Sequence, residues 1–239
     1  MKSLSRLLYA ILMVIPAPLA MAFCRVPQPR LVCAEYFASP LVVEATLVQT
    51  HVVGDAADPL GISGHVYTMK VNRVLRGEAN GPLRIYEGND SGRATFDWTT
   101  GKEYLLFLFY VPQEKSWELD GCGNSGPLNE ANDALSGIDA IKASHDGGVI
   151  YGEVSQQMLS VPIPGVHVEA QGENGKYAAT TTEDGRFQIR VPSGRYSVRV
   201  IDSEASFHMA DISYEDPRGI RIESGGCAQV QFVEIEQSQ

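Results

Sequence analysis

The chain has 239 residues, of which 29 are acidic and 19 are basic, so its formal net charge at pH 7 is −10. This acidic balance disfavours nucleic acid and anionic membranes as partners, because both bind through basic patches. The length suits two domains of about 100 residues each, and the sequence contains no motif from which we would expect a cofactor.

Residues 1–22 have the pattern of an export signal. Two basic side chains precede a short apolar stretch at residues 7–18, and residues 20–22 read Ala-Met-Ala, a small-x-small cleavage site. The apolar stretch is too short to span a membrane. We therefore expect cleavage after Ala22, an exported protein that is periplasmic or secreted, and no membrane insertion of the mature chain.

Most of the first domain, residues 23–143, is predicted to be β-structure. Short segments rich in Val, Thr and aromatic residues alternate with turns, as is typical of small barrels and sandwiches. The apolar run at residues 104–111 predicts a strand that is buried on both faces. The predicted strands are residues 41–48 with 52–53, 65–75, 83–86, 94–98 and 104–111, after a helical turn at 32–38.

One longer helix is predicted at the end of this domain, over residues 127–143. Leu, Ala and Ile recur there at helical spacing, and Asn129 or Asn132 is suited to cap the helix. Gly137 weakens its middle. We expect this helix to close the first domain, with a loop at residues 144–148 marking the boundary.

Residues 144–239 are predicted to form a second, all-β domain. Two neighbouring segments echo one another, GRFQIRV at 185–191 and GRYSVRV at 194–200, and predict a hairpin. Alternation places three apolar side chains of each segment on one face, so they supply much of the second core. The predicted strands are residues 149–154, 165–171, 177–182, 186–191, 195–202, 219–223 and 228–235.

The second domain resembles the carboxypeptidase regulatory-like family. Four segments carry the resemblance, in the family's order and spacing: IYGEV at 150–154, VPIPGVHV at 161–168, TTTEDGRF at 180–187 and VPSGRYSV at 191–198. The resemblance implies a transthyretin-like, or prealbumin-like, seven-stranded β-sandwich. It also implies a noncatalytic module.

The first domain resembles the netrin-like domain shared with tissue inhibitors of metalloproteinases. The resemblance rests on SPLVVEA at 39–45, VNRVLRG at 71–77, SG at 91–92, GKEYLLF at 101–107 and Cys122. It implies an OB-fold barrel. The family has a Cys-x-Cys pair near the mature N-terminus, whereas Cys24 here begins Cys-Arg-Val. Ser91 stands where one partner cysteine would be, so one disulfide of the family is missing.

Disulfides are predicted for the four cysteines, because their number is even and the protein is exported. The count allows three connectivities, and no clustered ligands suggest a zinc site. The netrin-like resemblance implies that Cys122 bonds to Cys24 or Cys33. We favour Cys33–Cys122 together with Cys24–Cys227. The alternative is Cys24–Cys122, with Cys33 and Cys227 either paired or free.

The netrin-like resemblance also implies one specific activity, the inhibition of a metalloprotease. In that family the free α-amine and carbonyl of an N-terminal cysteine chelate the zinc of the enzyme. Cleavage after Ala22 leaves Phe23 ahead of Cys24, and the additional residue would block this chemistry. Phe23 and Cys24 are therefore the candidate inhibitory N-terminus.

No catalytic residues are predicted. The five histidines are dispersed and no Gly-x-Ser-x-Gly elbow occurs. Cys122 lies between two glycines, but a disulfide explains it better than a nucleophile in an oxidising compartment. Acidic residues in the turns at 87–90 and 183–184 are interpreted as solvated side chains rather than as calcium ligands.

The candidate binding aromatics are Trp98 and Trp117, which flank the predicted strand at 104–111. OB-fold barrels bind oligosaccharides or oligonucleotides on one face, and the acidic charge disfavours the latter. The alternative is that Trp117 covers an end of the barrel. We expect a non-enzymatic binding protein that recognises a protein or glycan partner outside the cytoplasm. A metalloprotease inhibitor is the alternative, and an enzyme or hydrolase accessory comes third.

Overall fold

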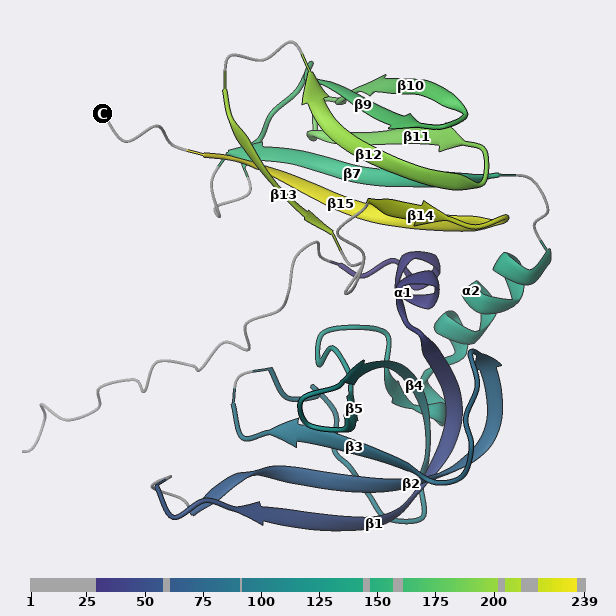
Figure 1. Cartoon of the computed structure of the whole chain (residues 1–239), viewed down its shortest axis with the longest axis vertical. Coiled ribbons are helices and arrows are strands. Elements are labelled where there is room, and N and C mark those ends of the chain that lie inside the picture. Colours follow the sequence, from purple (N-terminus) through teal and green to yellow (C-terminus); the bar gives the residue numbers. More distant parts are fainter. Residues whose placement is uncertain are drawn as a thin grey trace, which may run out of the picture.

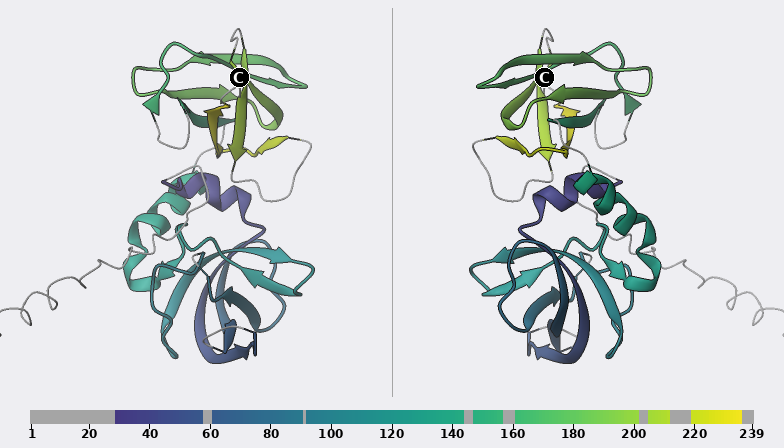
Figure 2. Two further views of the ribbon diagram at one scale, coloured as in Figure 1. Left: turned by 90° about the vertical axis from the view of Figure 1, so that its left-hand side faces the viewer. Right: turned by 90° about the vertical axis from the view of Figure 1, so that its right-hand side faces the viewer.

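The computed structural model of the chain describes residues 29–57, 61–90, 92–143, 147–156, 161–201, 205–211 and 219–235. It shows two β-rich units with the helices α1 (Val32–Ala38) and α2 (Asn132–Ala143) between them (Figure 1). The side views show the same arrangement (Figure 2). The expected fold class is confirmed: the protein is mainly β, with an OB-like barrel and a helix followed by a β-sandwich.

The first unit is a closed ring of five strands. Its sheet runs in the order β1-β2-β3-β5-β4-β6, and pairing of β1 with β4 closes the ring. All pairs in the ring are antiparallel except β3 with β5. The strands are β1 (Leu41–Gly54), β2 (Ile62–Arg76), β3 (Leu83–Gly88), β4 (Glu103–Val111), β5 (Ser116–Glu118) and β6 (Gly126–Pro127).

Strand β4 is buried on both faces, as the apolar run predicts. Leu106 and Leu108 belong to the core inside the ring. Leu105 and Phe107 point the other way and pack against the helices in a second core. The ring therefore has one wall that is covered from outside, and this wall carries α2.

Helix α2 begins later than predicted, because residues 128–130 form a short 3₁₀-helix. Gly137 in its middle has a packing role, since a Cβ at this position would lie 3.0 Å from Cγ1 of Val32 on α1. The glycine thus lets the two helices approach closely. No helix in the described part of the chain is long and apolar enough to cross a membrane.

The strand predicted at residues 94–98 is wrong. Residues 92–98 form a loop of turns and bends without strand structure, and Phe96 and Trp98 both turn onto the barrel core. The Trp98 ring stacks on Tyr67 with a centroid distance of 4.4 Å and also packs against Tyr104 at 4.9 Å. Phe96 and Trp98 therefore cover the same core from a loop, and a shared face does not require a strand here.

The second unit is a sandwich of two sheets. One sheet has the order β10-β9-β12-β14 and the other β11-β7-β15-β13, with β8 attached to β7. Strands β8 and β13 join the seven that the sequence predicts, and β15 runs parallel to β7. The bounds are β7 (Gly148–Gln156), β8 (Val161–Pro162), β9 (His167–Gly172), β10 (Gly175–Thr180), β11 (Arg186–Val191), β12 (Gly194–Ile201), β13 (Phe207–Asp211), β14 (Ile220–Ile222) and β15 (Gly226–Glu234).

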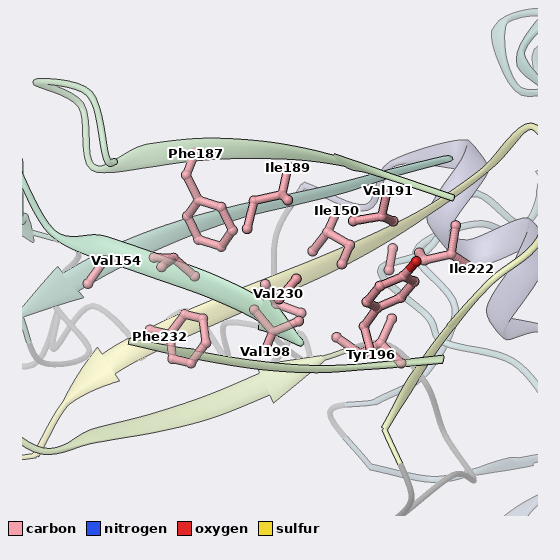
Figure 3. Close-up of a cluster of buried hydrophobic side chains, with 14 residues drawn as sticks. Ile150, Val154, Phe187, Ile189, Val191, Tyr196, Val198, Ile222, Val230 and Phe232 are labelled. Carbon is pink, nitrogen blue, oxygen red and sulfur yellow. The ribbon is translucent and has the colours of Figure 1, made fainter. Parts of the chain in front are cut away.

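The predicted hairpin of the echoed segments is wrong, although the predicted core face is correct. Strand β11 pairs with β7 in one sheet, and β12 pairs with β9 and β14 in the other. Phe187 and Ile189 on β11 therefore face Tyr196 and Val198 on β12 across the sandwich core (Figure 3). A period of two identifies which side chains are buried, but it does not identify the neighbouring strand.

Candidate functional site

Helix α1 joins the two units covalently. Cys33 on α1 forms a disulfide with Cys227 on β15, 194 residues away in sequence. Ala34 packs beside it and is almost completely buried. The favoured pairs Cys33–Cys122 and Cys24–Cys227 are therefore wrong, because α1 directs Cys33 towards the sandwich. Cys122 is also disulfide-bonded, and Cys24 lies outside the described residues.

The segment before α1 is held from both sides. On the sandwich side, the Gln229 side chain donates from Nε2 to the Pro29 carbonyl oxygen (2.7 Å) and accepts from the Leu31 backbone N–H (3.0 Å). On the barrel side, Arg30 donates from Nε and Nη2 to Oδ2 of Asp120, at 2.9 and 2.6 Å. Both charged side chains are nearly buried. Contacts on two sides therefore hold residues 29–31 in place, and this segment is called the wall below.

A buried glutamate fixes α1 to the barrel. Glu35 is 1% exposed, and its Oε2 accepts hydrogen bonds from the backbone N–H and Nδ2 of Asn124, at 2.7 and 2.6 Å. Burial raises the pKa of Glu35 to about 7, against the opposing effect of these hydrogen bonds. The sequence pattern does not indicate this role of Glu35, because a glutamate in a short helix has the pattern of a solvated side chain.

Arg76 at the end of β2 completes the joint, by which we mean the contacts of residues 29–38 with the barrel and the sandwich. Its guanidinium donates from Nη2 to Oε1 of Glu223 (2.8 Å) and from Nε to the Ser39 carbonyl oxygen (3.2 Å). The same group lies over the rings of Tyr36 and Phe37, at 5.5 and 5.0 Å from their centroids. The hydrogen bond to Arg76 lowers the pKa of Glu223. Arg76 thus contacts the barrel, α1 and the sandwich together.

A groove of about 750 Å³ lies on the sandwich beside the fixed wall. Its floor comes from the solvent-facing side of β7, β11 and β15, and its opposite side comes from the end of β10 and the turn before β11. The polar lining residues are Tyr151, Glu153, Thr180, Thr182, Asp184, Arg186, Gln188 and Gln229, while Pro29 and Leu31 form the wall. Ligand sites are often concave surfaces at such boundaries.

Strand register orders the floor into two rows. Gln188, Tyr151 and Gln229 are direct neighbours across β11, β7 and β15 in the first row. Arg186, Glu153 and Gln231 form the second row in the same way. Alternation along each strand points these side chains away from the core, to which their neighbours contribute.

Gly152 lets core side chains pack directly against the backbone of β7 beneath the groove. A Cβ at this position would collide with the Phe187 ring and would lie 2.8 Å from Cγ2 of Val230. The two side chains therefore pack directly on the backbone of β7. The floor of the groove is consequently supported by the core of the sandwich.

Some polar side chains on the outer face of this sheet have hydrogen-bond partners, and others have none. Nε2 of Gln231 donates to Oε1 of Glu153 at 2.8 Å, and Gln229 is committed to the wall. Buried Oε1 of Gln231 and Oγ of Ser155 have no hydrogen-bond partner among the described residues. Both atoms are buried, and neither residue lines the groove.

The predicted binding aromatics lie in the barrel and not in the groove. Trp98 donates from Nε1 to Oε1 of Glu87 at 3.2 Å, and Trp117 packs edge-to-face on Tyr110 at 5.3 Å. Both tryptophans are half-buried against the barrel core. The candidate inhibitory residues 23 and 24 lie outside the described residues. No three acidic, His or Cys side chains gather as metal ligands in the ranges described above.

Of the residues that line the groove, only Asp184 is among the candidate ligands in the sequence, where it is interpreted as a solvated turn acid. Tyr151 and Glu153 alternate with buried residues on β7, and Gln188 does so on β11. Their pattern is that of an ordinary solvent-facing sheet surface. Only the position of the wall, set by contacts across about 200 residues, distinguishes this surface from others.

Comparison with known proteins identifies one part of the chain. Residues 149–232 match the model of the carboxypeptidase regulatory-like domain. No curated protein matches the chain.

Solved structures show only a distant likeness. The chain is similar to the C-terminal fragment of pilus adhesin SpaC from Lactobacillus rhamnosus GG, with 9% identity and a TM-score of 0.28, over 90% of this chain and 95% of that one. It is also similar to SpaC in its open conformation, with 9% identity and a TM-score of 0.26, over 82% of this chain and 28% of that one. Likenesses at these scores support no statement about fold or function. The family match alone identifies residues 149–232 as a carboxypeptidase regulatory-like domain.

Proposed function

We propose that this chain is an exported, non-enzymatic binding protein that recognises a protein or glycan partner in the groove of its carboxypeptidase regulatory-like domain. The observation behind this proposal is the groove of about 750 Å³, whose wall is fixed by Gln229 and by the disulfide between Cys33 and Cys227. A preformed site costs little conformational entropy on binding. Rigid construction of this wall therefore favours recognition.

The compartment is consistent with such a role. A structural disulfide that links distant parts of the chain is typical of proteins outside the cytoplasm. The acidic net charge of −10 disfavours nucleic acid as the partner.

The absence of catalysis is part of the proposal. Glu153 accepts a hydrogen bond from a neutral carboxamide, and Arg186 lies 3.5 Å from Asp184. These charged groups of the groove are engaged by one another and by amides rather than by a histidine or a cysteine. That arrangement suits the orientation of a ligand better than proton transfer.

Capture by the immobilised mature protein tests the proposal. Extract of the native compartment is passed over the wild-type protein, Tyr151→Ala and Tyr110→Ala, and the retained proteins and polysaccharides are compared. Tyr110 is the matched control, because it is an exposed tyrosine (38%) on the barrel. We expect Tyr151→Ala alone to lose the partner. Equal retention by all three proteins would contradict the proposal.

A second proposal is inhibition of a metalloprotease through a netrin-like first domain. It is favoured by the closed five-strand ring and by the disulfide at Cys122, both of which the netrin-like resemblance implies. Sequencing of the mature N-terminus tests it together with an inhibition assay on metalloproteases. A mature chain that begins at Cys24 and inhibits supports this proposal, and a chain that begins at Phe23 removes the zinc-chelating mechanism.

A further inference from the structure

We infer that the groove binds a neutral, hydroxyl-rich oligosaccharide, with Tyr151 as the aromatic platform and Gln188 and Glu153 as its principal hydrogen-bonding groups. The inference rests on the proposed function and specifies the class of ligand. It follows from the spacing of the floor residues, from their free hydrogen-bonding capacity and from the charge of the groove.

The floor presents an aromatic ring beside polar groups at fixed spacing. Tyr151 neighbours Gln188 across the β7–β11 pair, and Glu153 follows two positions along β7. Paired strands lie about 4.8 Å apart, and residues i and i+2 of a strand lie about 7 Å apart. A flat pyranose ring that stacks on Tyr151 would therefore have a carboxamide at one edge and a carboxylate at the next.

Tyr151 is suited to this role because its position is fixed. The side chain is half-buried and packs against the cluster formed by Ala34 and Cys227. A ring held in this way loses little rotamer freedom on binding. Aromatic side chains also combine an apolar face with a polar tip, which matches the alternating C–H and O–H groups of a sugar.

The polar groups of this face have unused capacity. Neither the Tyr151 hydroxyl nor the Gln188 carboxamide forms a hydrogen bond in the described part of the chain, and Glu153 uses only Oε1. Tyr151, Gln188 and Glu153 all line the groove, so a ligand bound there can reach them. Sugar hydroxyls both donate and accept, so they suit donors and acceptors alike.

The charge of the groove favours a neutral ligand. Arg186 is the basic side chain of the lining, and its Nε lies 3.5 Å from Oδ2 of Asp184. Once that pair is formed, Glu153 is the remaining charged group of the lining, and it already accepts one hydrogen bond. The groove thus offers no basic cluster for sulfated or phosphorylated sugars.

A peptide would use the edge of the sheet rather than its face. Extended peptides add to a sheet through the backbone of an edge strand, and β11 is an edge strand of this sheet, whereas the groups without hydrogen-bond partners in the groove are side chains on the face of β7 and β11. The observations therefore favour a glycan over a peptide, and binding of a peptide becomes an outcome of the test.

The test uses the full mature protein with its disulfides intact and labelled with ¹⁵N. Linear neutral oligosaccharides of glucose, xylose, mannose and N-acetylglucosamine are titrated separately at millimolar concentration, and backbone amide shifts are followed. We expect at least one of them to shift amides of β7 and β11. Gln188→Ala should weaken binding about fivefold, the effect of one neutral hydrogen bond.

Matched variants separate the groove from nonspecific binding. Gln171→Ala is the control for Gln188→Ala, because Gln171 is an exposed glutamine on β9 of the other sheet. Tyr151→Ala should abolish binding, whereas Tyr151→Phe should keep the stacking surface and weaken binding only about fivefold. Shifts confined to the barrel, or equal binding by wild type and Tyr151→Ala, would overturn the inference.

The sugar titrations and the capture experiment together distinguish failure of the glycan inference from failure of the proposed function. Absence of shifts with all four sugar series overturns the glycan inference. If a protein partner is still captured by the wild type and lost in Tyr151→Ala, the proposed function stands with a peptide or protein ligand. If that capture also does not depend on Tyr151, the proposed function is wrong as well.

Discussion

Replacement of Glu35 by glutamine should abolish a pH dependence of stability that its burial creates. The pKa of Glu35 is raised from 4.5 to about 7 in the folded protein, chiefly by burial. Because the folded state prefers the protonated form, the stabilising contribution is complete below pH 4.5. It is lost as the pH rises through about 7.

The size of the effect follows from the shift. The difference between 4.5 and about 7 corresponds to about 3 kcal/mol at about 1.4 kcal/mol per pKa unit. Glutamine mimics the protonated acid, since its carbonyl oxygen can accept both hydrogen bonds from Asn124. The variant should therefore lack this slope, and its free energy of unfolding relative to wild type should rise by about 3 kcal/mol between about pH 5 and about pH 8.

Urea unfolding of the oxidised protein, followed by tryptophan fluorescence at several pH values, measures this difference. Glu114→Gln is the control, because the Glu114 side chain is exposed. It removes the same charge from the chain without removing a buried group. A difference between wild type and Glu35→Gln that stays constant from about pH 5 to about pH 8 would refute the reasoning.

Three further changes test the joint and the groove floor by denaturant unfolding. Gly152→Ala should destabilise the protein by about 1–3 kcal/mol, because the new methyl group overpacks the core, whereas an unchanged midpoint would contradict the close packing. Loss of the Cys33–Cys227 disulfide in the double serine variant should cost about 5 kcal/mol in the chain-entropy model for a loop of 194 residues, and a loss below about 1 kcal/mol would contradict that model. Arg76→Met should cost about 1–2 kcal/mol and raise the pKa of Glu223. The loss of stability as pH falls below 4.5 should then become smaller in this variant, and an unaltered acid profile would show that the ion pair contributes nothing.

Apolar periodicity predicts the buried faces of this protein well. The continuous run on β4 and the alternation on β11 and β12 each identify side chains that are buried in the structure. The pairing of strands is a different question, because an alternating strand suits either sheet equally. That is why β11 and β12 were expected to be hairpin partners and instead face each other.

Features that depend on distant contacts were beyond sequence reasoning. Four cysteines allow three connectivities, and nothing in their spacing shows that α1 directs Cys33 towards β15. The residues of the groove, such as Tyr151 and Gln188, have the pattern of any exposed sheet face. They become a candidate site only because Gln229 holds another segment beside them.

Strand β15 has a consequence for the order in which the protein assembles. It pairs with β7 and β13 inside the sandwich and also carries Cys227 and Gln229, which bind residues about 200 positions earlier. Helix α1 therefore stays without its covalent partner until the chain has been made as far as β15. Contacts of such high sequence separation form slowly. The wall of the groove should thus be a late product of folding, and a chain cut short of Cys227 would have a barrel whose helix α1 lacks its anchor.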